Sequence, residues 1–165
     1  MLYFCAMSSI VNKLDKLDFQ ILQYLQEDGR MSNVDLSQKI GLSPGPTLER
    51  VKKLEKKGLI LGYHARLNRP KLNLGVSVFI QVSLSRQLDR VMDRFHSRIL
   101  EIPQVMECYQ VTGNADFMLR VVVADIPALE HLISHVFSKM EEIGHLQTSL
   151  IISEKKVSQK LPLIF

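Results

Sequence analysis

Hydrophobic residues change their spacing near position 75, and this change divides the chain into two parts. In the first part they recur every three or four positions in three short runs, which is the spacing of helices that bury one face. In the second part the run from Val76 to Leu84 places a hydrophobic residue at every second position, which is the spacing of a half-buried strand. The pattern therefore predicts a helical N-terminal part followed by a part that contains strands.

The first two helices are marked by residues that favour helix ends. The first helix is predicted to have Asp15 as its N-cap and to stop at Asp28-Gly29. The second is predicted to begin at Ser32, with Asp35 completing a weak capping box, and to end at Gly41. Its buried residues are expected to be Val34, Leu36 and Ile40.

The stretch SPGPTLERVKKLEKKG, from Ser43 to Gly58, predicts the third helix. Ser43 is expected to cap it with its hydroxyl, and Pro44 falls at the first helical position, where its missing N–H costs no hydrogen bond. The apolar stripe is expected to consist of Leu48, Val51 and Leu54. The opposite face is expected to carry Gly45, Pro46, Glu49, Lys53 and Lys56, with Lys52 and Lys57 at its edges.

A strand-like run, Leu59–Asn68, follows the third helix. Three short helices, tight turns and a following strand predict a helix-turn-helix domain of the winged or strand-extended type. The segment LNRPKLNLG at 67–75 contains a proline, a glycine and two asparagines, and it predicts a linker.

The second part predicts four strands and two helices. The strands are expected at Val76–Leu84, Val105–Val111, Phe117–Val123 and Leu146–Ile152, and the helices at Leu88–Ile99 and Ile126–Met140. This β-α-β-β-α-β order is that of a ferredoxin-like unit, so the whole chain is predicted to be an α+β protein. The helices are expected on one face of the sheet, and a second copy of the chain is the simplest cover for the other face. We therefore expect a homodimer.

Composition narrows the class of protein. The chain has 165 residues, 46% of them hydrophobic, which is typical of a folded chain rather than a disordered one. No apolar run reaches the roughly 18 residues of a membrane span, so we expect no membrane contact and a cytoplasmic location. The cysteines Cys5 and Cys108 are too few for a disulfide framework or a tetrahedral zinc site, and we expect reduced thiols.

Catalytic and metal-binding patterns are weak. His131 and His135 lie four residues apart on a predicted helix, but no third metal ligand accompanies them. The chain has no phosphate-binding glycine loop, and Ser32 and Ser43 suit helix caps better than nucleophiles. We therefore expect no enzyme activity, no metal ion and no cofactor.

Positive charge is concentrated in the helical part. The net charge is +4, and residues 1–66 contribute +3 of it, from ten Lys and Arg against seven acids. The start of such a helix suits the major groove of DNA, and outward Lys and Arg suit its phosphates. For the lysine run taken alone, an ordinary solvated helix is the alternative. With the two preceding helices, the pattern favours double-stranded DNA as partner. The expected interface residues are Ser32, Ser43, Gly45, Pro46, Glu49, Arg50, Lys53 and Lys56.

Glu49 is unusual on such a surface because its charge repels phosphate. It can accept a hydrogen bond from a cytosine amino group, or it can pair with Lys53 along the helix. We favour the pair with Lys53.

The stretch TGNAD, Thr112–Asp116, lies between two predicted strands. Gly113-Asn114 is a natural turn, and a plain hairpin turn is one interpretation. In the other, the backbone N–H groups of the turn hold a carboxylate and Asp116 holds an ammonium group, an arrangement that would bind an amino acid zwitterion.

Taken together, these motifs resemble the Lrp/AsnC family, the feast/famine transcription regulators, from Leu14 to Lys156. LDKLDFQILQYLQEDGR is similar to the opening helix of the family, and GLSPGPTLERVKKLEKKGLILGY to its turn, recognition helix and following strand. VTGNADFMLRVVV is similar to its regulatory-domain turn, where a Gly-x-x-Asp element recurs. One departure is Gly45, where the family usually has Ser or Thr, so the operator preference is expected to differ.

The resemblance implies a DNA-binding dimer that senses an amino acid. The strand Leu59–Leu67 is expected to pair with its counterpart in the partner chain, and dimers are expected to assemble further, often to an octamer. Family members sense amino acids in clefts between dimers. By position, the effector residues here are Gly113, Asn114, Ala115, Asp116, Thr148 and Ser149.

The sequence leaves three hypotheses. The first is a transcription regulator whose assembly responds to an amino acid, and the second is an architectural protein that wraps DNA without an effector. The third is a metabolic enzyme or enzyme-regulating subunit that uses the helices for docking. In each case the expected segments are a flexible tail at 1–13, the helix-turn-helix domain at 14–66, the linker at 67–75, the ferredoxin-like domain at 76–156 and a C-terminal tail at 157–165.

Overall fold

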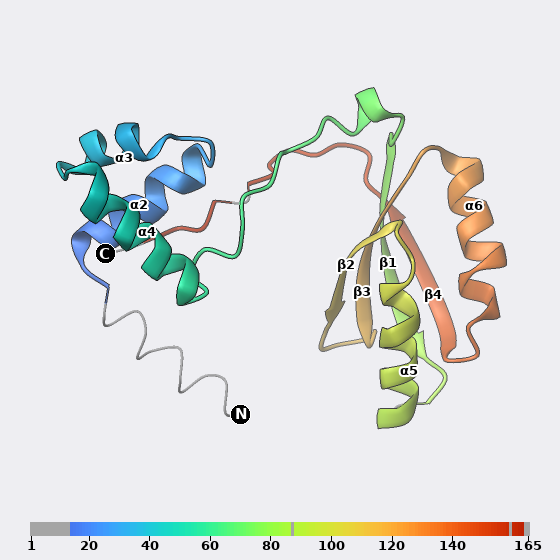
Figure 1. The fold of residues 1–165 in the computed structure, drawn as a ribbon. Helices are drawn as coiled ribbons and strands as arrows, with labels where there is room; N and C mark the ends of the chain where they lie inside the picture. Colours follow the sequence, from blue (N-terminus) through green and yellow to red (C-terminus); the bar gives the residue numbers. More distant parts are fainter. Residues whose placement is uncertain (1–13, 87, 159, 164–165) are drawn as a thin grey trace. The chain divides into compact units, whose positions relative to one another are not determined.

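The computed structural model describes residues 14–86, 88–158 and 160–163 and divides into two compact units (Figure 1). One unit comprises Met1–Arg66 together with Val157–Phe165, and the other comprises Leu67–Lys156. The tail predicted at 1–13, with Cys5, lies outside the described residues. Within those residues, no helix is both long and apolar enough to cross a membrane.

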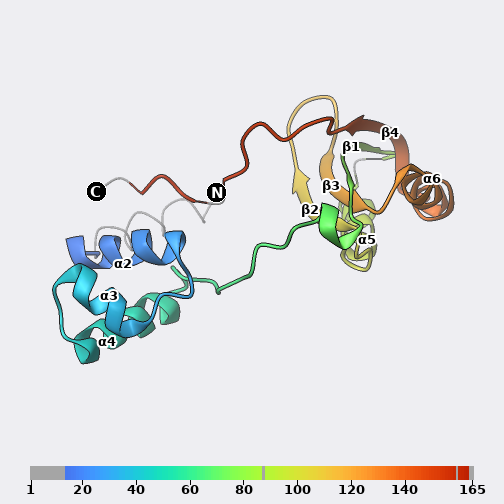
Figure 2. The ribbon, with the colours of Figure 1, turned by 90° about the horizontal axis from the view of Figure 1, so that it is seen from above.

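The first unit contains the three predicted helices, which Figure 2 shows packed together: α2 (Lys16–Glu27), α3 (Asn33–Ile40) and α4 (Pro44–Lys56). The Asp15 carboxylate accepts from the Asp18 N–H at 2.9 Å, and the Asp18 carboxylate accepts from the Asp15 N–H. The predicted cap is therefore a full capping box. At α3, the Ser32 hydroxyl accepts from the Asp35 N–H at 3.1 Å, and Gly41 ends the helix with a left-handed φ of 71°.

The core of this unit is formed by Ile21, Leu36, Ile40 and Leu54. Two expectations about its lining were wrong, because Val34 and Leu48 are 52% and 42% exposed. Thr47 is fully buried instead. Its hydroxyl donates to the Ser43 carbonyl at 2.9 Å, which satisfies the polar group and leaves its methyl to pack. The apolar stripe of α4 therefore keeps Val51 and Leu54 as predicted, with Thr47 in place of Leu48.

The residues after α4 differ from the prediction. No part of Leu59–Asn68 is a strand in this chain, and a strand is stable only beside another strand. The segment expected as a C-terminal tail contacts α2, because the Leu161 N–H donates to the Gln26 side chain at 2.6 Å. Lys160 also lies 3.7 Å from Glu27.

The second unit has the predicted β-α-β-β-α-β order. Its elements are η1 (Pro70–Leu72), β1 (Val76–Leu84), α5 (Asp89–Leu100), β2 (Val105–Gln110), β3 (Phe117–Val123), α6 (Ile126–His135), η2 (Phe137–Lys139) and β4 (Ile143–Leu150). The strands form an antiparallel sheet in the order β2-β3-β1-β4. The last strand, β4, begins three residues earlier than expected and ends two residues earlier. The second helix, α6, ends at His135, and the short η2 follows it.

Both α5 and α6 cover one face of the sheet, which Figures 1 and 2 show from two sides. The alternating residues Val78, Ile80 and Val82 of β1 pack there against Phe95 and Leu132, among others. The intervening residues of β1, such as Phe79, lie on the other face, which no helix of this unit covers. We call this second surface the open face of the sheet.

Candidate nucleic-acid interface and ligand-binding turn

The start of α4 differs from the expected one in its cap. Ser43 occupies the N-cap position, but its hydroxyl makes no capping hydrogen bond. An N-cap side chain pairs with the N–H of the second or third helical residue, and here the third is Pro46, which has none. Pro44 takes the predicted first position, so among the first three helical residues only Gly45 has an N–H.

The outward face of α4 is basic. Lys52, Lys53 and Lys56 are exposed, as are Gly45 and Pro46 near the helix start. Glu49 does not make the favoured pair with Lys53; its carboxylate lies 3.7 Å from the Lys52 ammonium, one step closer along the helix. This pair offsets the one acidic charge of the face and leaves Lys53 and Lys56 for an anionic partner.

Arg50 points the other way. One nitrogen of its guanidinium lies 2.7 Å from both the Asp15 and the Asp18 carboxylates, so it joins α4 to the start of α2. These hydrogen bonds raise the pKa of Arg50 above its ordinary value. The Asp18 backbone N–H, together with Arg50, lowers the pKa of Asp15. This position favours a structural role for Arg50 over the expected DNA contact.

Two side chains that sequence reasoning missed hold α4 in place. The Asn33 amide donates to the Pro44 carbonyl at 2.8 Å and ties α3 to the start of α4. The Tyr63 hydroxyl donates to Glu55 at 3.0 Å, and burial with this hydrogen bond raises the pKa of Tyr63 to about 12. Neither contact has a local sequence signal, since each joins residues of different segments. Ser32 remains exposed and serves as the cap of α3.

The turn between β2 and β3 is fastened to β1. Gly113 has a φ of 117°, which only glycine adopts readily. The Asp116 carboxylate accepts from the Leu84 N–H at 2.7 Å, and the Ser83 hydroxyl donates to the Asn114 carbonyl at 3.2 Å. Ala115 lies between these anchors and is half-buried. The turn is thus a fixed structure in which Asp116 already has a backbone partner.

The other two predicted effector residues lie on β4. Thr148 pairs with Ile80 and Ser149 with Phe79, so their side chains belong to opposite faces of the sheet. The turn is level with Val82 to Leu84, and Thr148 is about 7 Å further along the strands, at 3.3 Å per residue. One copy of the chain therefore does not bring Thr148 and Ser149 together with the turn.

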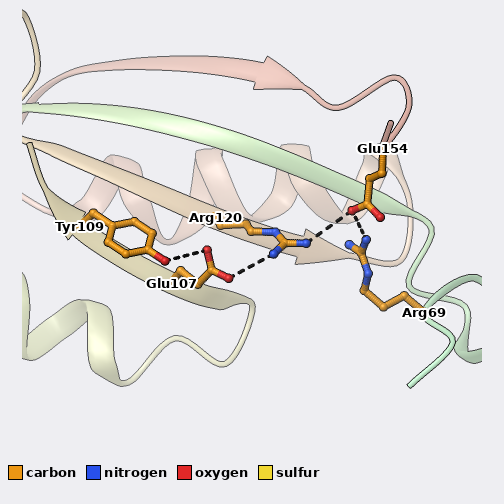
Figure 3. A network of polar contacts seen from close by, with 5 residues as sticks. All are labelled: Arg69, Glu107, Tyr109, Arg120 and Glu154. Atoms are coloured by element: carbon orange, nitrogen blue, oxygen red, sulfur yellow. Dashed lines mark hydrogen bonds and ion pairs between the residues drawn. The ribbon is translucent and has the colours of Figure 1, made fainter. Parts of the chain in front are cut away.

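A polar network crosses the open face of the sheet (Figure 3). Arg120 on β3 donates to Glu107 on β2 at 3.1 Å and to Glu154, beyond β4, at 3.4 Å. Glu154 also binds Arg69, which precedes η1, and Glu107 accepts from the Tyr109 hydroxyl, an interaction that raises the pKa of Tyr109. The network connects the sheet to the chain segments that enter and leave this unit.

The residues considered for other chemistry do not assemble into a site in the described part of the chain. The His131 and His135 rings stack with centroids 4.5 Å apart, but no group of three potential metal ligands exists there. Cys108 is a free thiol, half-buried, and burial raises its pKa.

Comparison with known proteins gives two family matches. Residues 77–161 match the Lrp/AsnC ligand binding domain, and residues 14–60 match a winged helix-turn-helix DNA-binding domain. The Bkd operon transcriptional regulator of Pseudomonas aeruginosa is 41% identical over 151 residues, which cover 92% of this chain and 99% of that one. The leucine-responsive regulatory protein of Escherichia coli is 37% identical over 148 residues, 90% of each chain.

Solved structures agree with these matches. A transcriptional regulator from Neisseria meningitidis, crystallised with L-methionine, superposes with a TM-score of 0.87 at 36% identity, over 91% of this chain and 97% of that one. An AsnC family transcriptional regulator from Agrobacterium tumefaciens superposes with a TM-score of 0.85 at 34% identity, over 90% and 97%.

Proposed function

The chain belongs to the Lrp/AsnC family of DNA-binding transcription regulators, and we propose that a homodimer of it inserts one α4 helix into the major groove at each of two half-sites. An amino acid bound by the second unit then adjusts its assembly. The relatives are transcriptional regulators, which are not enzymes. A cytoplasmic location follows from the proposal, because the DNA lies there.

The observation that carries the proposal is the outward face of α4. Lys53 and Lys56 are exposed on a helix whose orientation is fixed by Arg50 and Asn33. In the major groove these lysines would contact phosphates, while the residues Ser43 to Pro46 lie at the end that meets base edges. We propose that Ser32, which is exposed at the start of α3, contacts the DNA backbone of the same half-site. Two-fold symmetry makes the operator a rough palindrome, with half-sites about 34 Å apart.

The open face of the sheet supports the dimer. Phe79 is 39% exposed and Tyr109 is 53% exposed, so large apolar groups lie on a face that the helices leave uncovered. The buried Nε of Arg120 has no acceptor within the described residues, and a second copy would supply one. The segment Leu59–Leu67 would likewise gain a pairing partner in the second chain. Further association of dimers, up to an octamer, belongs to the same proposal.

The amino acid site is proposed at the turn of Gly113, Asn114, Ala115 and Asp116. The turn presents backbone groups and a carboxylate that would hold the two charged ends of a zwitterion. Thr148 and Ser149 would join it only from another copy of the chain, which agrees with a site formed between dimers. The relative crystallised with L-methionine and those called leucine-responsive supply the first two ligands to test.

Salt dependence of DNA binding tests the proposal. A genomic fragment selected by the protein is titrated by fluorescence anisotropy at several salt concentrations. The Lys53→Ala substitution is expected to weaken binding to all sequences and to reduce the log–log slope by about 0.9, one phosphate contact.

Lys139→Ala is the control, because Lys139 is an exposed lysine of the second unit. An unchanged slope for Lys53→Ala would mean that this face of α4 does not meet DNA. Calorimetry with L-methionine, L-leucine and the other amino acids tests the effector. If none of them releases heat, the effector-independent architectural protein is the better description.

A further inference from the structure

We propose that Leu48 reads the methyl group of a thymine in each half-site. This inference rests on the proposed placement of α4 in the major groove and names one base that the helix selects. Leu48 would be a specificity-determining residue that acts through an apolar contact.

Leu48 is not required by the core of its own unit. Its side chain is 42% exposed, whereas Thr47 beside it is fully buried and Leu54 is 1% exposed. By helical periodicity Leu48 shares the outward surface of α4 with Gly45, one turn before it, and Lys52, one turn after it. An apolar side chain therefore lies within a basic face, between the helix start and the lysines.

The residues around Leu48 offer few groups for hydrogen-bonded base reading. Gly45 has no side chain, and Pro46 has neither a polar side-chain atom nor an N–H. Glu49 is paired with Lys52. A Cβ added at Gly45 would meet nothing within 4 Å, so the fold does not need glycine there, and the space above it is open. A base edge can approach this turn closely, and Leu48 is the first large side chain that it would meet.

The major groove offers one kind of apolar group to such a side chain. Guanine, cytosine and adenine present only hydrogen-bond donors and acceptors there, while thymine also presents its C5 methyl. Lys56, about two turns after Leu48 along α4, is exposed and would hold a flanking phosphate. Burying the methyl against Leu48 removes apolar surface of both partners from water.

The test removes only that methyl group. In a selected operator, each thymine is replaced in turn by deoxyuridine, which keeps every hydrogen-bonding group, and affinity is measured by fluorescence anisotropy with the full-length protein. Wild-type protein should lose about fourfold in affinity per substituted half-site at one symmetric pair of thymines, as expected for one buried methyl. Leu48→Ala should bind the unmodified operator more weakly and show no further loss at that pair.

Matched variants isolate the contact. Val34→Ala shortens another exposed aliphatic residue, on α3, and Leu100→Ala does the same on α5; both should keep the full deoxyuridine penalty. The inference is overturned if wild-type protein tolerates deoxyuridine at every thymine, if Leu48→Ala keeps the penalty, or if Val34→Ala removes it. If Lys53→Ala still reduces the log–log slope by about 0.9 in that case, the groove placement of α4 stands and only the Leu48 contact is lost. If Lys53→Ala leaves the slope unchanged as well, the groove placement is lost too.

Discussion

Pro46 shows how one residue changes the chemistry of a helix start. A serine before a helix is ordinarily a cap, and sequence reasoning assigned Ser43 that role. The cap fails because the usual donor, the third N–H of α4, is absent at Pro46. Ser32 caps α3 as predicted, because Asp35 supplies that N–H. The Ser43 hydroxyl is therefore left for a partner outside the helix, and the proposed one is DNA.

A double-mutant cycle checks this account of Ser43. Ser43→Ala should change the free energy of unfolding little, because no capping hydrogen bond is lost. In a Pro46→Ala background, the restored N–H lets the hydroxyl cap α4, so Ser43→Ala should then cost about 1 kcal/mol. Urea denaturation of the four proteins measures the difference. Ser32→Ala is the positive control, with a cost of about 1 kcal/mol in either background. A similar cost for Ser43→Ala in the otherwise unchanged chain would contradict the structure.

At the scale of residues, the sequence predicted where α4 lies more accurately than which of its residues are buried. The hydrophobic period located α4, and the proline rule placed its first residue at Pro44. Val51 and Leu54 pack into the core as predicted, but Leu48 was wrong and Thr47 takes its place, because a buried threonine looks polar in sequence. Arg50 could not be assigned either, since its carboxylate partner Asp18 is 32 positions away and nothing local marks the pair.

At the scale of elements, the alternation of hydrophobic residues predicted the strands and the face of each that is buried. Strands β1 and β3 have the predicted bounds, because alternate residues pack into the core along the whole length of each strand. The same alternation implies that adjacent residues on β4 face opposite ways, so Thr148 and Ser149 could not both join one site within a single chain. The role of Asp116 as an anchor for Leu84 was hidden, because it depends on which strand lies beside the turn.

At the turn between β2 and β3, one substitution can separate the structural role of Asp116 from its proposed role in binding an amino acid. Asp116→Asn keeps an acceptor oxygen for the Leu84 N–H but removes the negative charge proposed to hold an ammonium group. We expect DNA affinity without ligand to stay within about twofold, while the calorimetric signal with the active amino acid, L-methionine or L-leucine first, is lost.

Asp93→Asn makes the same change of charge on the exposed surface of α5 and should leave ligand binding intact. An Asp116→Asn variant that binds the amino acid as tightly as the unchanged protein would show that the zwitterion is held elsewhere. Loss of the fold, seen by circular dichroism, would instead reveal that the anchor needs the charge.

At the scale of the whole molecule, the two units supply different halves of one function. The first unit offers a basic helix but only one copy of it, and one half-site gives limited affinity. The second unit has a sheet with one face covered by α5 and α6 and one open face that carries Phe79, Tyr109 and the Arg120 network. Pairing through the open face would link two α4 helices, so that the second half-site binds within the same complex.

Phe79→Glu tests this link between assembly and DNA binding. Phe79 is 39% exposed in the single chain, so the fold should survive. Burying a carboxylate between two sheets would still oppose dimer formation, because pairing with Arg120, its neighbour on β3, does not recover the full cost of removing the charge from water. Sedimentation should show monomers, and affinity for a palindromic operator should fall by about a hundredfold or more, because the second half-site is no longer tethered. Affinity for a single half-site should change little.

Leu100→Glu places the same charge on α5, on the helical side of the sheet, where the residue is 73% exposed. It should leave both the dimer and operator binding unchanged. A Phe79→Glu protein that still sediments as a dimer would place the two-fold contact on another surface. The open face would then need a different cover, because Tyr109 and the unpaired Nε of Arg120 lie on it.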